Sequence, residues 1–186
     1  MSNSAHAYHT GKEIKHNGMH FIFLSKGKTN IIKSIRYTYV QEYLGKALYN
    51  LGFGDYDITT GAISDDLVSN NGDQYKVFNT VLNSIPAFFN HYPSAVLIVR
   101  GSDSLSNFIE KCRKKCTNKC VGNQCQKAHR RIGIYRQYVD SNYNVLTNEY
   151  QFFGGFVAGN NQIITEKYQV GLAYTAVLLT KKSNFI

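Results

Sequence analysis

Alternating apolar and polar positions dominate the first third of the chain and predict paired strands. In residues 31–40, Ile31, Ile35 and Tyr37 fall on one face, while Ser34 and Arg36 fall on the other. Residues 20–25 and 47–53 predict two further strands. The five residues 26–30 have the right length for a hairpin turn between the first two strands. We therefore expect this part of the chain to form an antiparallel sheet.

Helical spacing begins near residue 72 and continues to residue 91. Val77, Val81, Ile85 and Phe88 recur at intervals of three or four positions. Pro86 lies inside this stretch and predicts a kink or a division of the helix. Further along the chain, the patterns predict a buried strand at 94–100, a helix at 132–139, and strands at 151–158, 162–165 and 169–180.

The predicted element order is β-β-β-α-β-α followed by a β-rich C-terminal part. This order is typical of an α+β fold, with helices packed on a mostly antiparallel sheet. We expect residues 1–18 to be a flexible, polar N-terminus and residues 19–186 to form a single domain. Within that domain, residues 104–130 are expected to form a small Cys-rich basic insertion.

No apolar stretch approaches the roughly 20 residues that a membrane helix requires. The first fifteen residues also lack the apolar core of a signal peptide. We therefore expect a cytoplasmic protein that does not bind membranes.

Positive charge is concentrated in one part of the chain, residues 111–131, which we call the basic segment. The whole chain carries 21 Lys and Arg against 12 Asp and Glu. The basic segment contains no acidic residue and eight basic ones: Lys111, Arg113, Lys114, Lys115, Lys119, Lys127, Arg130 and Arg131. A localised excess of this kind predicts a surface that attracts the phosphates of RNA or DNA.

Every cysteine of the chain lies in the same segment. Cys112, Cys116, Cys120 and Cys125 are followed four positions later by His129. Closely spaced thiols in a chain without a secretory signal favour a metal site over a disulfide framework. Cys112 and Cys116 share a helix face, and Cys120, Cys125 and His129 are candidates for the rest of a tetrahedral zinc site. Free thiols in a basic helical hairpin and a redox disulfide are the alternatives.

Five of the twelve acidic residues fall between residues 55 and 73. Among them, Asp55, Asp57 and Asp73 are candidate catalytic residues, because closely placed carboxylates bind a divalent cation that activates water. Aspartates also form turns and cap helices, and this structural interpretation is the one we favour.

Four of the six histidines precede residue 21 at no recognised ligand spacing, so we expect them in solvent.

A second candidate site combines Gly101 and Ser102, at the end of the predicted buried strand, with Arg131 and Tyr135. Arg131 and Tyr135 are four positions apart and share a helix face. Backbone amides after a strand, together with an arginine, predict a cradle for phosphate or carboxylate. The alternative is an arginine paired with an acid and a tyrosine that only packs.

Four short motifs follow one another along the chain. They are NLxFGD at 50–55, NGD at 71–73, TV…F…YP at 80–93, and GS…R…YR, formed by residues 101–102 with Arg131, Tyr135 and Arg136. Over roughly residues 21–139 they resemble a family of uncharacterised bacterial proteins. In the family pattern the Arg-Tyr element follows Gly-Ser closely, whereas here it comes about 25 residues later and the cysteines lie in the gap. The resemblance implies a shared α/β core with a metal-binding insertion, and no established activity.

Three functions are compatible with these patterns. Nucleic-acid binding through a zinc-clamped basic segment is favoured, because it needs only the charge clustering that the sequence contains. The second is an enzyme acting on RNA or nucleotides, such as a toxin-like ribonuclease, whose candidate catalytic residues are the aspartates at 55–73 or Arg131 and Tyr135. The third is a protein-interaction module that docks an acidic partner.

Overall fold

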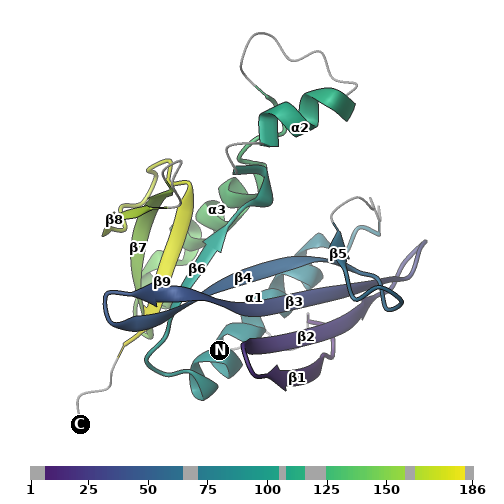
Figure 1. Ribbon diagram of the computed structural model, residues 1–186, viewed down its shortest axis with the longest axis horizontal. Helices are drawn as coiled ribbons and strands as arrows, with labels where there is room; N and C mark the ends of the chain where they lie inside the picture. The colour runs from purple at the N-terminus through teal and green to yellow at the C-terminus, as the bar shows by residue number, and fades with distance from the viewer. Residues whose placement is uncertain (1–6, 65–70, 105–107, 116–124, 158–161, 183–186) are drawn as a thin grey trace. The chain divides into compact units, whose positions relative to one another are not determined.

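The computed structural model describes residues 7–64, 71–104, 108–115, 125–157 and 162–182 (Figure 1). Its contacts divide the chain into two compact units, Met1–Ala95 and Val96–Ile186. Each unit combines antiparallel strands with helices, so the prediction of an α+β fold with a mostly antiparallel sheet is confirmed. In the described part of the chain, no helix is long and apolar enough to cross a membrane.

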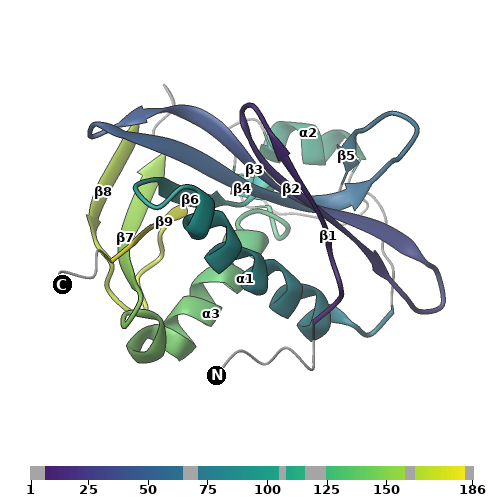
Figure 2. The ribbon, with the colours of Figure 1, turned by 90° about the horizontal axis from the view of Figure 1, so that it is seen from below.

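The first unit is an antiparallel sheet whose strands pair in chain order, with one helix packed on it. Figure 2 shows the helix lying along one face of these strands. The elements are β1 (Gly11–Lys15), β2 (Gly18–Ser25), β3 (Ile31–Tyr43), β4 (Lys46–Tyr56), β5 (Ile63–Ser64) and α1 (Gln74–His91). The strands predicted at 20–25, 31–40 and 47–53 are thus confirmed as β2, β3 and β4.

Two features of the first unit differ from the expectation. Strand β1 lies inside the segment 1–18, for which no regular element was predicted, because its five residues are mostly polar and all exposed. Helix α1 runs through Pro86 without a break, so the predicted division of the helix is wrong. Pro86 lies on the exposed side of the helix. There its ring does not disturb the packing of α1 on the sheet.

The core of the first unit forms between α1 and the inward face of the sheet. Val81 and Phe88 are buried, as the helical spacing predicted, whereas Val77 and Ile85 are half-buried. The Phe88 ring stacks on Tyr37 of β3 with ring centroids 4.5 Å apart. The Tyr37 hydroxyl lies 2.6 Å from Ser84 Oγ on α1, so the buried phenol has a polar partner.

The second unit is a four-stranded antiparallel sheet in the order β6-β9-β7-β8, contacted by α3 on β6 and β9. Its elements are β6 (Val96–Arg100), η2 (Ser102–Ser104), α2 (Phe108–Lys115), α3 (Arg130–Leu146), β7 (Tyr150–Val157), β8 (Ile163–Lys167) and β9 (Ala176–Lys181). Strand β9 is shorter than the predicted 169–180. Helix α3 is longer than the predicted 132–139, and Ile132 and Val139 are its buried residues.

Candidate nucleic-acid interface

Helix α2 contributes the first part of the basic segment. Phe108, Ile109 and Cys112 are half-buried, while the basic side chains of Lys111, Arg113 and Lys114 are exposed, so the helix is amphipathic (the Lys115 side chain lies outside the described set). The Lys114 ammonium lies 3.5 Å from the Glu110 carboxylate, one helical turn away, and both side chains are exposed. A pair of this kind is screened by water and leaves Lys114 able to exchange partners.

The second part of the basic segment is the turn that leads into α3. Ala128 donates its backbone N–H to Cys125 O, and His129 has a left-handed backbone with φ of 58° before α3 begins at Arg130. Lys127 and Arg130 are exposed. Lys119 lies outside the described residues. The predicted nucleic-acid-binding residues that are described thus include several exposed cations on α2 and at the start of α3.

Two of the five predicted zinc ligands lie together. The sulfur atoms of Cys112 and Cys125 are 3.7 Å apart, and both residues are half-buried. His129 instead points Nδ1 at Ser104 Oγ, 3.1 Å away. Cys116 and Cys120 fall outside the described residues. Within the described residues, no group of three or more His, Cys, Asp or Glu side chains is arranged to hold a metal ion.

The Gly-Ser strand end and Arg131 also come together, but an acidic side chain lies between them. Arg131 donates from Nη1 to Ser102 Oγ, and its backbone N–H donates to Asp103 Oδ2 at 2.9 Å. Asp103 is 5% exposed and its backbone carbonyl accepts the His129 N–H, so this residue caps the start of α3. Tyr135 lies one turn later on α3 and is half-buried.

Asp103 changes what this corner of the second unit can bind. A carboxylate at the N-terminus of a helix satisfies the amides that would otherwise attract an anion, and its charge repels phosphate. At the cradle that was one of the two predictions for this corner, the Arg131 amide is therefore already bonded to a carboxylate. The sequence contains no local signal for this cap, because Asp103 and Arg131 are 28 positions apart.

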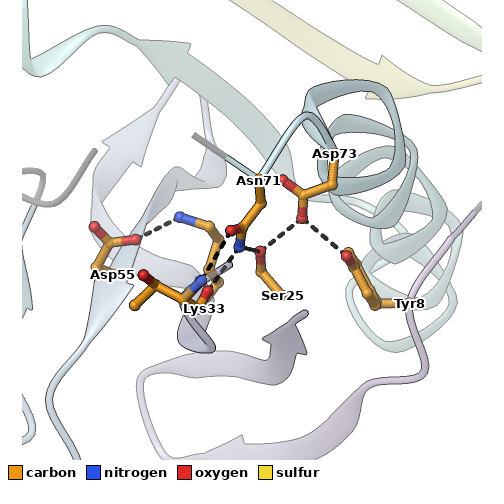
Figure 3. Close-up of polar contacts among 7 residues, drawn as sticks. Tyr8, Ser25, Lys33, Asp55, Asn71 and Asp73 are labelled. Carbon is orange, nitrogen blue, oxygen red and sulfur yellow. Dashed lines mark hydrogen bonds and ion pairs between the residues drawn. The ribbon is translucent and has the colours of Figure 1, made fainter. Parts of the chain in front are cut away.

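In the first unit, Asp55 is paired with a residue that the sequence analysis did not single out. Lys33 of β3 lies opposite Asp55 of β4, and Lys33 Nζ is 2.5 Å from Asp55 Oδ1 (Figure 3). Both side chains are buried. The alternation of β3 places Lys33 on the α1 face, but a pairing across 22 positions depends on strand register that the sequence does not show.

Asp73 lies at the start of α1 and accepts two hydroxyl hydrogen bonds. Ser25 Oγ donates to Asp73 Oδ2 at 2.6 Å, and Tyr8 donates its phenol hydrogen to the same oxygen at 2.8 Å (Figure 3). Burial raises the pKa of the Asp73 carboxyl, but these two hydrogen bonds and the nearby Lys33 charge outweigh burial, so the pKa is lowered. Asp73 is therefore ionised at neutral pH and ties three separate segments together.

Asn71 extends this polar network to the β2–β3 turn. Its side-chain amide donates to Ser25 Oγ and to Thr29 O, and its Oδ1 accepts the Thr29 N–H. A Cβ at Gly27 would overlap the Asn71 side chain, so only glycine permits this close approach. Lys33 thus acts on the residues that end the NLxFGD and NGD motifs, on Asp55 through a direct ion pair and on the pKa of Asp73 through its charge.

Asp57 has a different, purely local environment. Its carboxylate accepts the backbone N–H groups of Thr59 and Thr60, and these hydrogen bonds lower the pKa of Asp57, which is exposed. This is the geometry of an aspartate that stabilises a turn. Asp65 and Asp66 lie outside the described residues. Each described candidate aspartate therefore has a partner that accounts for its position.

His20 is not in solvent, and the expectation for this histidine is wrong. It is 3% exposed, its Nε2 lies 2.7 Å from Ser34 Oγ, and its Nδ1 lies 3.8 Å from the Glu13 carboxylate. The order Ser-His-Glu resembles a hydrolase triad. Ser34, however, is 0% exposed, and a nucleophile must be reached by its substrate. We therefore interpret the arrangement as a buried hydrogen bond that satisfies both side chains.

Residues 5–109 match the model of a family of unknown function, DUF6934. The match covers the strands and the helix of the first unit and reaches the start of α2. The cysteines and the segment from Arg131 to Arg136 lie outside it. No curated protein and no solved structure matches the chain.

Proposed function

Because this chain belongs to DUF6934, a family of unknown function, its activity has to be inferred from its own residues, and we propose that it binds nucleic acid through the basic segment, residues 111–131. The observation that carries this proposal is the exposure of the cationic side chains. Lys111, Lys114, Lys127 and Arg130 all face solvent on α2 and at the start of α3. The basic segment itself contains no carboxylate, and the Glu110 carboxylate that lies 3.5 Å from Lys114 just outside it forms only an exposed pair.

Phosphate is the chemical group that such a surface attracts most strongly. Lys and Arg side chains neutralise backbone phosphates and release the counterions that surround nucleic acid, which gives affinity without sequence specificity. Because the Arg131 backbone N–H at the start of α3 already donates to Asp103, we expect phosphate to be bound by side chains and not by backbone amides. We therefore expect DNA and RNA of different sequences to bind with similar affinity.

We further propose that a zinc ion holds the basic segment together. Two thiolates bound to one tetrahedral zinc at a Zn–S distance of about 2.3 Å have their sulfurs about 3.8 Å apart. The 3.7 Å separation of the Cys112 and Cys125 sulfurs fits this arrangement. Cys116 and Cys120, which lie outside the described residues, are the proposed remaining ligands. The zinc would have a structural role, because four thiolates leave no open coordination position for chemistry.

The test is the salt dependence of oligonucleotide binding. With about half of the eight basic residues reaching phosphates, the log–log slope of affinity against salt should be about −3 to −4. The variant Lys111→Ala/Lys114→Ala/Lys127→Ala/Arg130→Ala should lose most of this slope. The matched control changes four exposed lysines elsewhere, Lys12, Lys46, Lys167 and Lys182. The control removes the same net charge and should keep most of the affinity.

The same titrations separate the proposal from its two alternatives. An enzyme acting on RNA through Asp55 and Asp73 would cleave a labelled oligonucleotide, and the basic variant would keep turnover at saturating substrate. A module for an acidic protein would bind a polyglutamate peptide in preference to the oligonucleotide. Equal affinities and equal salt slopes for the parent and the basic variant would contradict nucleic-acid binding by this segment.

A further inference from the structure

The Cys112 and Cys125 thiols form a pair whose geometry also suits a second kind of chemistry. Twelve residues separate them in sequence, yet their sulfurs lie 3.7 Å apart. A disulfide has an S–S distance of about 2.05 Å. The two sulfurs are therefore already close to contact, and bond formation requires an approach of less than about 2 Å.

The pair lies in the part of the chain where positive charge is concentrated. Both cysteines are half-buried and neither is fully enclosed. In the sequence, Lys111 and Arg113 are the immediate neighbours of Cys112, and Lys127 follows Cys125 by two positions. Thiol–disulfide exchange proceeds by attack of a thiolate on a disulfide sulfur.

We propose that Cys112 and Cys125 form a reversible disulfide with low-molecular-weight disulfides, such as oxidised glutathione, as the oxidant. The Cys112 thiolate attacks one sulfur of the oxidant, forms a mixed disulfide and releases one glutathione thiolate. The Cys125 thiolate then attacks the Cys112 sulfur and releases the second glutathione. The protein loses two electrons and two protons, and one oxidised glutathione becomes two reduced ones.

The disulfide and the zinc ion compete for the same two sulfurs. A sulfur within a disulfide carries no thiolate charge and does not bind zinc in the way that Cys S⁻ does. The protein thus has a reduced form that holds zinc and an oxidised form that does not. This competition rests on the zinc site proposed above, whereas the disulfide requires only the two thiols.

The experiment uses the full chain, treated with chelator and then with oxidised glutathione, and maps the products by mass spectrometry. The parent should lose two hydrogen atoms and give one cross-linked fragment that joins Cys112 to Cys125. In Cys125→Ser, a glutathione adduct should persist on Cys112, because no second thiol resolves it. The control Cys116→Ser/Cys120→Ser should still form the Cys112–Cys125 cross-link, and dithiothreitol should reverse it.

Two outcomes would overturn the disulfide. One is a stable glutathione adduct on Cys112 in the parent, and the other is a cross-link from Cys112 to a cysteine other than Cys125. A second arm repeats the oxidation with zinc-loaded protein, which should react at least tenfold more slowly. An unchanged rate there would contradict the proposed zinc site and leave the disulfide standing, so the two failures are distinguishable.

Discussion

Lys33 and Asp55 form a buried ion pair between neighbouring strands of the first unit, with Lys33 Nζ 2.5 Å from Asp55 Oδ1. The side chains are 11% and 7% exposed, so neither charge is well hydrated. Attraction between the partners compensates their lost hydration only while both are present. The Lys33 charge also helps to lower the pKa of Asp73. Removing the Lys33 charge would therefore also change the electrostatics of the polar network around Asp73 at the start of α1.

Removing one partner should destabilise the protein strongly. We expect Lys33→Met to lower the free energy of unfolding by about 3–5 kcal/mol, because Asp55 is then buried without its counter-charge. Lys15→Met is the control, since Lys15 pairs with Glu13 at 3.2 Å but both side chains are exposed. That change should cost at most about 1 kcal/mol. Urea denaturation followed by circular dichroism gives both values.

The double variant Lys33→Met/Asp55→Leu distinguishes an ion pair from general packing. Replacing both charges with apolar side chains of similar size removes the unpaired carboxylate, so much of the lost stability should return. A double variant as unstable as Lys33→Met would show that the loss comes from packing around Lys33 and not from Asp55.

The elements that the sequence predicts correctly are those whose signal is local. The spacing of Val81 and Phe88 identifies α1, and the alternation through Ile35 and Tyr37 identifies β3, because one face of each is buried. Strand β1 shows no such alternation, since all its residues are exposed. Pairing with β2 forms it through backbone hydrogen bonds that do not depend on its side chains.

The candidate site was predictable in composition but not in geometry. The charge of the basic segment is countable in the sequence, and the exposure of Lys111 and Lys114 follows from the amphipathic pattern of α2. The Asp103 cap and the contact between Cys112 and Cys125 bring together residues 28 and 13 positions apart. Such contacts depend on how η2, α2 and α3 fold back on each other, which a single sequence does not encode in any local pattern.

His20 should make stability depend on pH in the mildly acidic range. Burial lowers the pKa of His20 below its ordinary value of 6.5, the Arg36 and Lys15 charges lower it further, and Glu13 opposes them. The unfolded state therefore takes up a proton before the folded state does. The free energy of unfolding should be constant with respect to this group above pH 6.5 and fall as the pH drops through the folded pKa.

Urea denaturation at a series of pH values between neutral and mildly acidic measures this effect. His20→Gln keeps a polar partner for Ser34 but does not titrate, so its stability should vary less over the same range. His91→Gln is the matched control, because His91 is exposed at the end of α1. A His20→Gln variant with the same pH dependence as the parent would contradict the assignment.

Two glycines of the second unit should respond in opposite directions to the same substitution. A Cβ at Gly154 of β7 would overlap the ring of Tyr174, so Gly154→Ala should cost about 1–3 kcal/mol or more. A Cβ at Gly133 of α3 meets no atom within 4 Å, and alanine is the better helix former by about 1 kcal/mol. Thermal melts of the two variants should show a lowered and a raised midpoint. Shifts in the same direction would contradict the packing described for β7 or α3.

Zinc content tests the proposed clamp of the basic segment directly. Protein purified without chelator should contain about one zinc per chain by elemental analysis, because four thiolates complete one tetrahedral site. Cys112→Ser and Cys125→Ser should each lose most of the metal. His129→Gln should keep it, since His129 Nδ1 lies 3.1 Å from Ser104 Oγ and the structure does not group this side chain with the two thiols.

Chelation provides the complementary measurement. All four cysteines lie between residues 112 and 125, and the first unit contains none, so its sheet and α1 do not depend on the metal. Removing zinc should therefore increase proteolytic cleavage within the basic segment and leave a cooperative thermal transition in place. Less than about a tenth of an equivalent of zinc in the parent would contradict the metal site, since a thiolate site binds zinc tightly at neutral pH. Global unfolding on chelation would instead show that the second unit needs the ion to fold.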